Sequence, residues 1–277
     1  MTTWINGRPG DCIDPGDRGL QFGDGLFETL RIDAGRPCFW PRHRQRLAAG
    51  CERLGIDGLD WPLLERELHA LAAKQPRAAL KLIVTRGSSE RGYRADAALA
   101  ANRILRLAAL PAPPPAPLRV RLCAWRLAVQ PALAGIKHLN RLDQVMARRE
   151  WDDPGIAEGL VLDRRGRLVE GTMSNLFLVR DGRLLTPDLS DCGVAGILRS
   201  VIIDRAAEEG IALSRQPLTP DDLAAADEVL LCNSLLGLCP VGRVEGIGEF
   251  RPGPVGRRLQ QRLARQPTDD SSNWYSR

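Results

Sequence analysis

Hydrophobic and polar residues alternate along the N-terminal third of the chain in the way that half-buried β-strands require. Strands are predicted at Thr3–Asn6, Leu26–Ile32, Pro37–Trp40, Ala79–Thr85 and Arg103–Leu110. Apolar residues recur at helical spacing over Pro41–Leu54 and from Trp61 to about Ala73, and each run has proline near its start, where helices tolerate it. This part of the chain is therefore predicted to be a sheet with two helices.

A proline-rich stretch, PAPPPAP at 111–117, interrupts these patterns and favours a stiff, extended linker. We expect an N-terminal α+β domain at 1–110, a second domain at 118–266 and a disordered polar tail at 267–277. The second domain should contain helices at Leu139–Trp151 and from the Cys192–Arg199 turn to about Glu209. Its strands are predicted at Leu118–Trp125, Ala157–Leu162, Arg167–Glu170, Leu176–Val179 and Leu184–Thr186, with a last one at Glu228–Cys232. The fold class is therefore α/β.

Composition and charge narrow the classes of function. The 277 residues are 44% hydrophobic, enough for a large core, yet no apolar run reaches the ~18 residues of a membrane span. Met1–Gly10 lacks the layout of a signal peptide, so a cytoplasmic location is expected. The seven cysteines contain no CxxC pair, which argues against a disulfide framework and a metal site and predicts reduced core thiols. The net charge of +5 is spread along the chain, which predicts a solvated arginine-rich surface rather than a nucleic-acid interface and leaves a modest bias toward small acidic substrates.

Lys137 is one of only three lysines among 39 basic residues. Arginine keeps its proton and cannot act as an amine nucleophile, whereas a desolvated lysine can attack a carbonyl. The flanking Gly135 and Ile136, followed by apolar residues at helical spacing, put Lys137 where a buried strand or loop meets an amphipathic helix. A surface lysine at a helix start is the alternative.

Five further features carry groups that a cofactor or substrate could use. Arg46 shares a helix face with apolar residues, although it could also extend to solvent. Glu170 ends a strand, where it could hold a proton on a heterocycle or serve as a cap or ion-pair partner. The turn before the helix that follows Gly196 suits a phosphate, and Asn233 adds a polar group at a strand end. The loop Arg86–Tyr93 is suited to gripping a carboxylate, or is merely solvated.

A nucleophilic lysine, a phosphate-suited helix start, an isolated arginine and a strand-end carboxylate are what a pyridoxal 5'-phosphate (PLP) enzyme needs. The sequence resembles the fold-type IV PLP enzymes, the class-IV aminotransferase family. Stretches that carry the likeness, in the family's order, are DRGLQFGDGLFET (17–29), His43–Leu47, Lys137, VEGTMSNLF (169–177) and GVAGILR (193–199). The resemblance implies a smaller N-terminal α/β domain and a larger C-terminal pseudo-barrel α/β domain.

The resemblance also implies roles for individual residues. Lys137 would bind PLP covalently, Arg46 would bind its phosphate, Glu170 would face its pyridine nitrogen, and backbone at Gly196 and Ile197 would complete the phosphate site. We expect Asn233 to contact the cofactor as well. Residues expected to contact substrate are Thr29, Arg86, Arg91 and Tyr93.

Within the family, AGIKHLNRLDQV, VTRGSSERGY and LLCNSLLGLCPV most resemble the aminodeoxychorismate lyase branch. Leu198 stands where aminotransferases often carry a phosphate-binding threonine, and Phe27 where D-amino acid transaminase has a tyrosine. The resemblance implies conversion of 4-amino-4-deoxychorismate to 4-aminobenzoate and pyruvate, in a homodimer. A D-amino acid or branched-chain aminotransferase is the alternative, and a non-catalytic PLP-binding protein is a second one.

Overall fold

A computed structural model describes residues 1–95 and 99–265, and the chain divides into two compact units. The first unit contains Met1–Pro111 together with the short segment Ile136–Asn140. The second contains Ala112–Gly135 and continues from Arg141. Lys137 therefore groups with the N-terminal unit, whereas the predicted boundaries assigned it to the C-terminal domain. The predicted tail at 267–277 lies outside the described residues.

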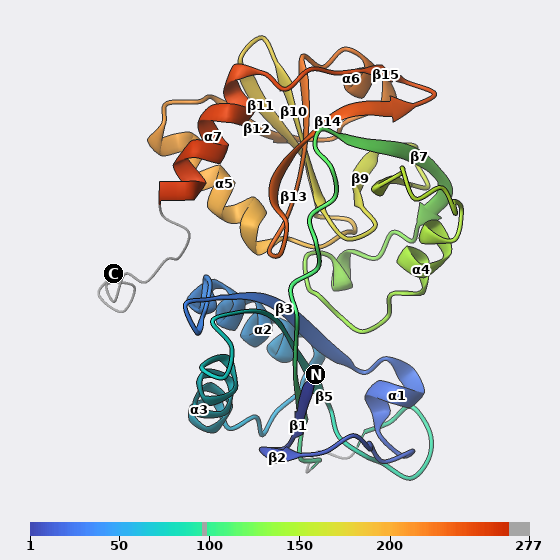
Figure 1. The fold of residues 1–277 in the computed structure, drawn as a ribbon. Coiled ribbons are helices and arrows are strands. Elements are labelled where there is room, and N and C mark those ends of the chain that lie inside the picture. Colours follow the sequence, from blue (N-terminus) through green and yellow to red (C-terminus); the bar gives the residue numbers. More distant parts are fainter. Residues whose placement is uncertain (96–98, 266–277) are drawn as a thin grey trace. The chain divides into compact units, whose positions relative to one another are not determined.

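The first unit is built on a six-stranded sheet in the order β2-β1-β6-β5-β3-β4 (Figure 1). Its strands are β1 (Thr2–Ile5), β2 (Arg8–Pro9), β3 (Gly25–Asp33), β4 (Arg36–Pro37), β5 (Arg77–Thr85) and β6 (Asn102–Ala108). All pairings are antiparallel. Along β3 buried positions alternate with partly exposed ones, and the buried face includes Leu26, Leu30 and Ile32. The predicted alternation is thus confirmed.

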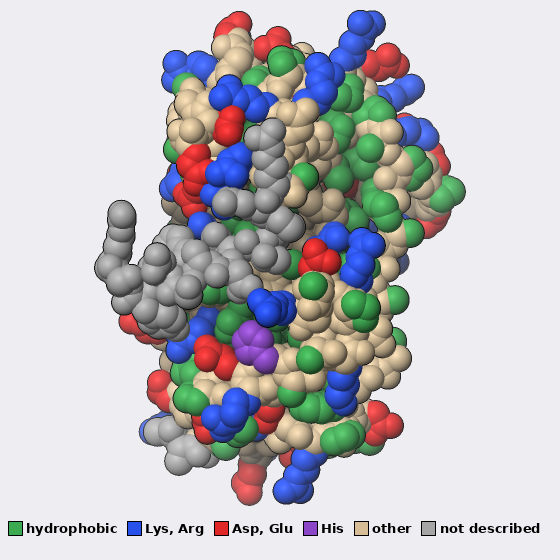
Figure 2. Space-filling model, turned by 60° about the vertical axis from the view of Figure 1, so that its left-hand side comes forward, with side chains coloured by type: hydrophobic (Ala, Val, Ile, Leu, Met, Phe, Trp, Pro, Cys, Tyr) green, Lys and Arg blue, Asp and Glu red, His purple; other side chains and the backbone are tan. Residues whose placement is uncertain are grey.

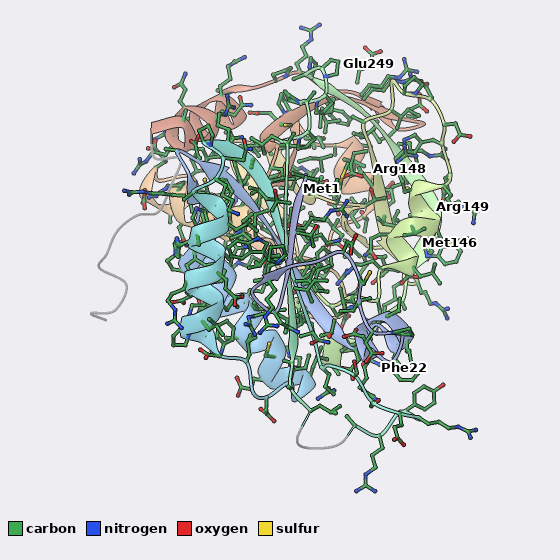
Figure 3. The ribbon with its side chains drawn as sticks, turned by 60° about the horizontal axis from the view of Figure 1, so that its bottom comes forward. Met1, Phe22, Met146, Arg148, Arg149 and Glu249 are labelled. Carbon is green, nitrogen blue, oxygen red and sulfur yellow. The ribbon has the colours of Figure 1, made fainter. Side chains whose placement is uncertain are left out.

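Helices α2 (Trp40–Leu54) and α3 (Trp61–Ala72) pack against the strands of this sheet. Both agree with the predicted helices to within one residue at each end. The sequence did not predict α1 (Arg18–Phe22), a helix of five residues whose start is capped by the Asp17 side chain and whose end is Gly23 at φ 67°. Phe22, at the end of this helix, is labelled in Figure 3.

The segment Ile136–Asn140 lies beside β3 and forms an isolated antiparallel bridge to it between His138 and Leu26. The Phe27 N–H donates to the Lys137 carbonyl at 2.9 Å, and the Leu139 N–H donates to the Gly25 carbonyl at 2.9 Å. The predicted start of the next helix at Leu139 was therefore wrong, because this backbone is already used in strand pairing. Helix α4 begins at Leu142 and ends at Arg148.

The second unit contains a nine-stranded sheet in the order β12-β11-β10-β13-β14-β7-β8-β9, with β15 paired to β14. Its strands are β7 (Leu118–Leu127), β8 (Glu158–Asp163), β9 (Leu168–Gly171), β10 (Asn175–Arg180), β11 (Arg183–Pro187), β12 (Leu213–Gln216), β13 (Glu228–Asn233), β14 (Gly237–Glu245) and β15 (Gly248–Glu249). The Leu168 N–H on β9 donates to the Leu218 carbonyl, just after β12, at 2.8 Å. This bond joins the two ends of the sheet, so the sheet curls into a half-barrel and confirms the predicted mixed α/β class.

The remaining helices of the second unit are the 3-10 turn η1 (Pro131–Leu133), α5 (Ile197–Glu208), α6 (Pro220–Ala224) and α7 (Pro254–Arg265). The prediction of Glu228–Cys232 as the last strand was wrong, because β14, β15 and α7 follow it. Strand β14 contains Pro240 and Gly242, and its register against β7 shifts between Val241 and Arg243. These residues break the regular alternation by which a strand is recognised in a sequence.

The apolar residues of helix α4 do not all face the core, as their helical spacing had predicted. Leu142 and Val145 are among the apolar residues at helical spacing after Lys137, yet they are 70% and 52% exposed, while Ala147 is buried. Met146, Arg148 and Arg149 lie around its last turn (Figure 3). Spacing correctly predicted a helix here but not the direction in which its apolar residues point.

The surface of each unit carries interspersed charges. On the face drawn in Figure 2, Lys and Arg side chains lie among Asp and Glu side chains. In the described part of the chain, no helix is long and apolar enough to cross a membrane. All seven cysteines are free, and five are buried, but Cys12 is exposed and so is not the core thiol that we expected.

Candidate active site

Lys137 lies against an aromatic side chain of the first unit. Its Nζ atom is 4.4 Å from the centroid of the Phe27 ring, a distance at which an ammonium group is attracted to the ring face. The backbone bond between Phe27 and Lys137 fixes the two residues opposite each other. The predicted nucleophile is therefore held on the partly exposed side of β3.

A buried ionic cluster lies on the other side of the same strand. Glu28 accepts a bidentate contact from Arg46, with 2.8 Å between Arg46 Nε and Glu28 Oε1 and a second contact from Nη2 to Oε2. His43 Nδ1 lies 2.6 Å from Glu28 Oε2. Glu28 and His43 are almost fully buried, so the two carboxylate oxygens hold both neighbours in fixed orientations. The predicted phosphate ligand Arg46 is thus positioned by Glu28.

The charges in this cluster follow from its partners. Burial alone would raise the pKa of Glu28, but the charge of Arg46 and the contact with His43 lower that pKa to about 2. Burial lowers the pKa of His43, and the positive charges of Arg46 and Lys137 lower it further, against the opposing effect of Glu28. His43 is therefore neutral at pH 7. Because the Glu28 carboxylate can only accept, His43 must carry its hydrogen on Nδ1.

We expect Glu28→Gln to destabilise the protein in a pH-dependent way. The pKa of Glu28 lies below its ordinary value of 4.5, so its ionised form contributes stability above about pH 5, which is lost as the pH falls toward 2. The variant should be less stable by on the order of 3 kcal/mol at pH 7, and the difference should shrink in acid. Urea unfolding at pH 7, 5 and 3 measures it. The exposed Glu52→Gln, on the same unit, is the matched control, and a pH-independent difference would contradict the assignment.

Glu170 occupies the end of β9 in the second unit and is 5% exposed. Its Oε2 atom accepts a hydrogen bond from the Val194 N–H at 2.8 Å, and Gln144 Nε2 approaches Oε1 at 3.4 Å. The adjacent Gly193 has φ 85°, a conformation that favours glycine, and a Cβ there would lie 2.7 Å from Val169 Cγ1. The backbone of the loop before α5 therefore packs closely against the Glu170 carboxylate.

The start of α5 meets the requirements of an anion site. Gly196 is its N-cap residue, and no side chain caps the helix. A Cβ at Gly196 would collide with Asn175 Oδ1, while Asn175 Nδ2 donates to the Val194 carbonyl at 2.9 Å. The helix dipole and first-turn N–H groups, including that of Ile197, make such a start suited to phosphate. The structure thus puts Glu170, Gly196 and Ile197 on neighbouring parts of one unit.

Glu158 is a buried carboxylate that sequence reasoning missed. It accepts hydrogen bonds from the backbone of Thr172 at 3.1 Å and Met173 at 3.2 Å, and from the Ser174 hydroxyl at 2.8 Å. These bonds fix the turn that directly follows Glu170. Glu158 stands between Ala157 and Gly159, and this local sequence carries no signal for such a role.

The Asn233 side chain forms hydrogen bonds with the backbone of the turn that follows it. Its Oδ1 atom accepts from the Leu235 N–H at 3.0 Å and the Leu236 N–H at 2.8 Å, and its Nδ2 donates to the Met173 carbonyl at 3.3 Å. These bonds give Asn233 a structural role, and its contact with a cofactor stays a prediction.

The loop Arg86–Tyr93 is anchored from within the first unit. Arg86 donates to both oxygens of Asp24, at 2.7 and 3.0 Å, and to the carbonyls of Leu54 and Gly55 at the end of α2. The buried Arg18 binds the Tyr93 carbonyl at 2.7 Å. These hydrogen bonds use most of the donors of the Arg86 guanidinium within the protein. A contact between Arg86 and substrate stays a prediction, and this arrangement does not favour it.

The other predicted substrate residues lie on two different parts of the first unit. Arg91 is exposed, and the Tyr93 side chain is 86% exposed with its ring 5.3 Å from that of Phe22. Thr29 lies on β3, on the same side as Phe27, and pairs across the sheet with Lys81. Sequence reasoning assigned no role to Lys81 or to Glu28. The alternation of buried and exposed positions along β3 did contain a signal for Glu28, because Glu28 is an acidic residue at a position whose side chain faces the core.

Comparison with known proteins extends over both units. The amino-transferase class IV family profile matches residues 25–244. The chain is 35% identical to aminodeoxychorismate lyase of Vibrio harveyi over 267 residues, which cover 94% of this chain and 98% of that one. It is 28% identical to D-alanine aminotransferase of Bacillus licheniformis over 272 residues, 95% of this chain and 96% of that one.

A solved structure gives a stronger likeness. The crystal structure of 4-amino-4-deoxychorismate lyase from Pseudomonas aeruginosa matches with a TM-score of 0.91 and 46% identity, covering 95% of this chain and 98% of that chain. Fold and sequence therefore agree over nearly the full length.

Proposed function

Because the chain belongs to the amino-transferase class IV family, we propose that it is a PLP-dependent lyase that converts 4-amino-4-deoxychorismate to 4-aminobenzoate and pyruvate. The observation that carries the proposal is the 46% identity and TM-score of 0.91 to a lyase of that name, over 95% of the chain. Among the aminotransferase relatives that match over nearly the whole chain, a putative branched-chain-amino-acid aminotransferase of Methanocaldococcus jannaschii is 31% identical and the D-alanine aminotransferase 28%, both below the lyase.

The residues present fit PLP. The uncapped start of α5, with a glycine where a Cβ would collide, suits the phosphate. The buried carboxylate Glu170 suits a protonated ring nitrogen, and Lys137 is the lysine for the covalent bond. Arg46, held by Glu28, would add a positive charge for the phosphate. When bound, PLP would supply an electrophilic carbonyl and an electron-withdrawing ring.

The side chains of this protein would divide the remaining work. Glu170, oriented by the Val194 N–H, would hold the proton on the pyridine nitrogen. Lys137 would remove the proton from the substrate carbon that bears the amine. Loss of this proton and of the ring-bound enolpyruvyl group yields an aromatic product, which provides the driving force. No amino acceptor is needed.

Direct assay tests the proposal. We expect the purified holoenzyme to release 4-aminobenzoate and pyruvate in equal amounts from 4-amino-4-deoxychorismate, measured by fluorescence and by a lactate dehydrogenase coupling reaction. Under the same conditions an amino donor with 2-oxoglutarate should give little glutamate. Glutamate formation without 4-aminobenzoate would instead identify an aminotransferase.

The homodimer remains a part of the proposal that rests on resemblance, and the cytoplasmic location remains an expectation from the sequence alone. In relatives of this group the neighbouring subunit completes the substrate end of the site, so the exposed Tyr93 would lie near a second copy. Sedimentation of the holoenzyme at assay concentration tests the dimer.

A further inference from the structure

Helix α4 turns a polar side chain inward and leaves apolar side chains in solvent (Figure 1). Leu142 and Val145 are 70% and 52% exposed, whereas the Oε1 atom of Gln144, between them in the sequence, is buried. Ala147, one turn after Gln144, is fully buried, so this side of the helix faces the interior. Burying the leucine in place of the amide would be more favourable. Such a conflict with a local rule is expected at functional sites.

The buried amide of Gln144 is only half satisfied. Its Nε2 atom donates to Glu170 Oε1 at 3.4 Å, while its Oε1 atom has no hydrogen-bond partner within residues 1–95 and 99–265. The opposite assignment of the amide would point its oxygen at the carboxylate, so the nitrogen is the atom that faces Glu170. A buried polar atom without a partner destabilises a fold. Stability therefore does not explain why a glutamine lies beside Glu170.

Helix α4 holds Gln144 at a fixed place relative to Glu170. Asp143, in the first turn of the helix, accepts from Trp125 Nε1 at 3.0 Å and from the Ala128 N–H at 3.3 Å, which ties the helix to β7 and the residue after it. Strand β7 pairs with β8, and β8 pairs with β9, the strand that carries Glu170. The amide and the carboxylate thus lie on neighbouring regular elements of one unit. Such elements position a side chain more precisely than loops do.

Glu170 receives a hydrogen-bond donor on each of its two oxygens. The Val194 N–H donates to Oε2 at 2.8 Å, and the Gln144 amide donates to Oε1. Donors on both oxygens oppose rotation of the carboxylate and offset part of the unfavourable energy of burying its charge. The remaining lone pairs of the carboxylate then keep one direction, which a group that holds a ring nitrogen requires.

We propose that Gln144 is a positioning residue that orients the Glu170 carboxylate toward the pyridine nitrogen of PLP. This inference rests on the proposed function, because it adopts the role assigned there to Glu170. Gln144 acts through Glu170 and not on the substrate. The buried amide oxygen without a partner is the destabilising consequence of placing the amide nitrogen beside the carboxylate.

A double-mutant cycle on the holoenzyme tests the inference. Gln144→Met keeps the length of the side chain and removes its donor, and Glu170→Gln removes the charge on which that donor acts. The rate of PLP release after dilution, followed by the fluorescence of free PLP, is measured for wild type, both single variants and the double variant. Gln144→Met should accelerate release by about 3- to 10-fold, within the range of effects for residues in contact. In the Glu170→Gln background the same substitution should change release by less than about twofold.

Kinetics and thermal unfolding add independent readouts. Gln144→Met should lower kcat by about 3- to 10-fold, with a smaller change in KM, because no substrate contact is removed. Its melting temperature should not fall, since the substitution also removes the buried oxygen without a partner. Gln261→Met, the same substitution at an exposed position of α7, is the matched control and should match wild type.

Two outcomes would overturn the inference and leave Gln144 with a structural role. One is an equal effect of Gln144→Met in both backgrounds, including no effect, and the other is a lower melting temperature with unchanged PLP release. A wild type that binds PLP but releases no 4-aminobenzoate would overturn the proposed lyase alone, because PLP release still tests the coupling between Gln144 and Glu170. A wild type that binds no PLP would overturn both.

Discussion

Lys137→Arg is expected to lower kcat by at least about 10⁴-fold, because the variant loses both a nucleophile and a proton-transfer group, and proton transfer alone contributes about 10²- to 10⁴-fold. Arginine keeps a positive charge that can lie over the Phe27 ring, so the fold should survive. Steady-state release of 4-aminobenzoate measures the loss, and the melting temperature checks the fold.

Chemical labelling identifies the lysine independently of turnover. After borohydride reduction of the wild-type holoenzyme, peptide mapping should find the pyridoxyl group on Lys137. With only three lysines in the chain, the result is unambiguous. Lys74→Arg should label and turn over as wild type does. An adduct on Lys74 or Lys81 would contradict the assignment of Lys137.

Glu170→Gln is expected to lower kcat by about 10²- to 10³-fold, the usual effect of removing one preorganised electrostatic group from an active site. The amide keeps an oxygen that can accept the Val194 N–H, so the loop before α5 should stay in place. It cannot, however, stabilise a protonated ring nitrogen with a negative charge. The variant should therefore retain PLP, as judged by its absorbance, while it loses turnover.

The control for this variant removes a carboxylate of the same unit that has no site role. Glu249 lies exposed on β15 (Figure 3), so Glu249→Gln should behave as wild type. Near wild-type turnover in Glu170→Gln would mean that another acid faces the ring nitrogen. Loss of PLP with an unfolded second unit would show instead that the buried Val194 contact holds the loop together.

Local patterns in the sequence were enough for most of the elements. The strict alternation of β3 and β5 and the proline-led starts of α2 and α3 each reflect a short-range rule, and the structure confirms them. The prediction failed where long-range contacts override such rules. The sequence predicted a helix from Leu139, but backbone hydrogen bonds to β3, more than a hundred positions earlier, hold residues 137–139 beside that strand.

The sequence by itself determined the α/β class, the family and the identity of the candidate groups. The spacing of apolar residues, the order of the motifs and the rarity of lysine can all be recognised without knowing which residues are in contact. Only the tertiary structure decided what those groups touch. In the structure Arg86 forms an ion pair with Asp24, and Glu28 contacts Arg46 and His43. Lys81 and Lys137 both lie over the Phe27 ring. A charged side chain has several partners that would satisfy it, and the fold selects among them by bringing distant strands together, which no local pattern records.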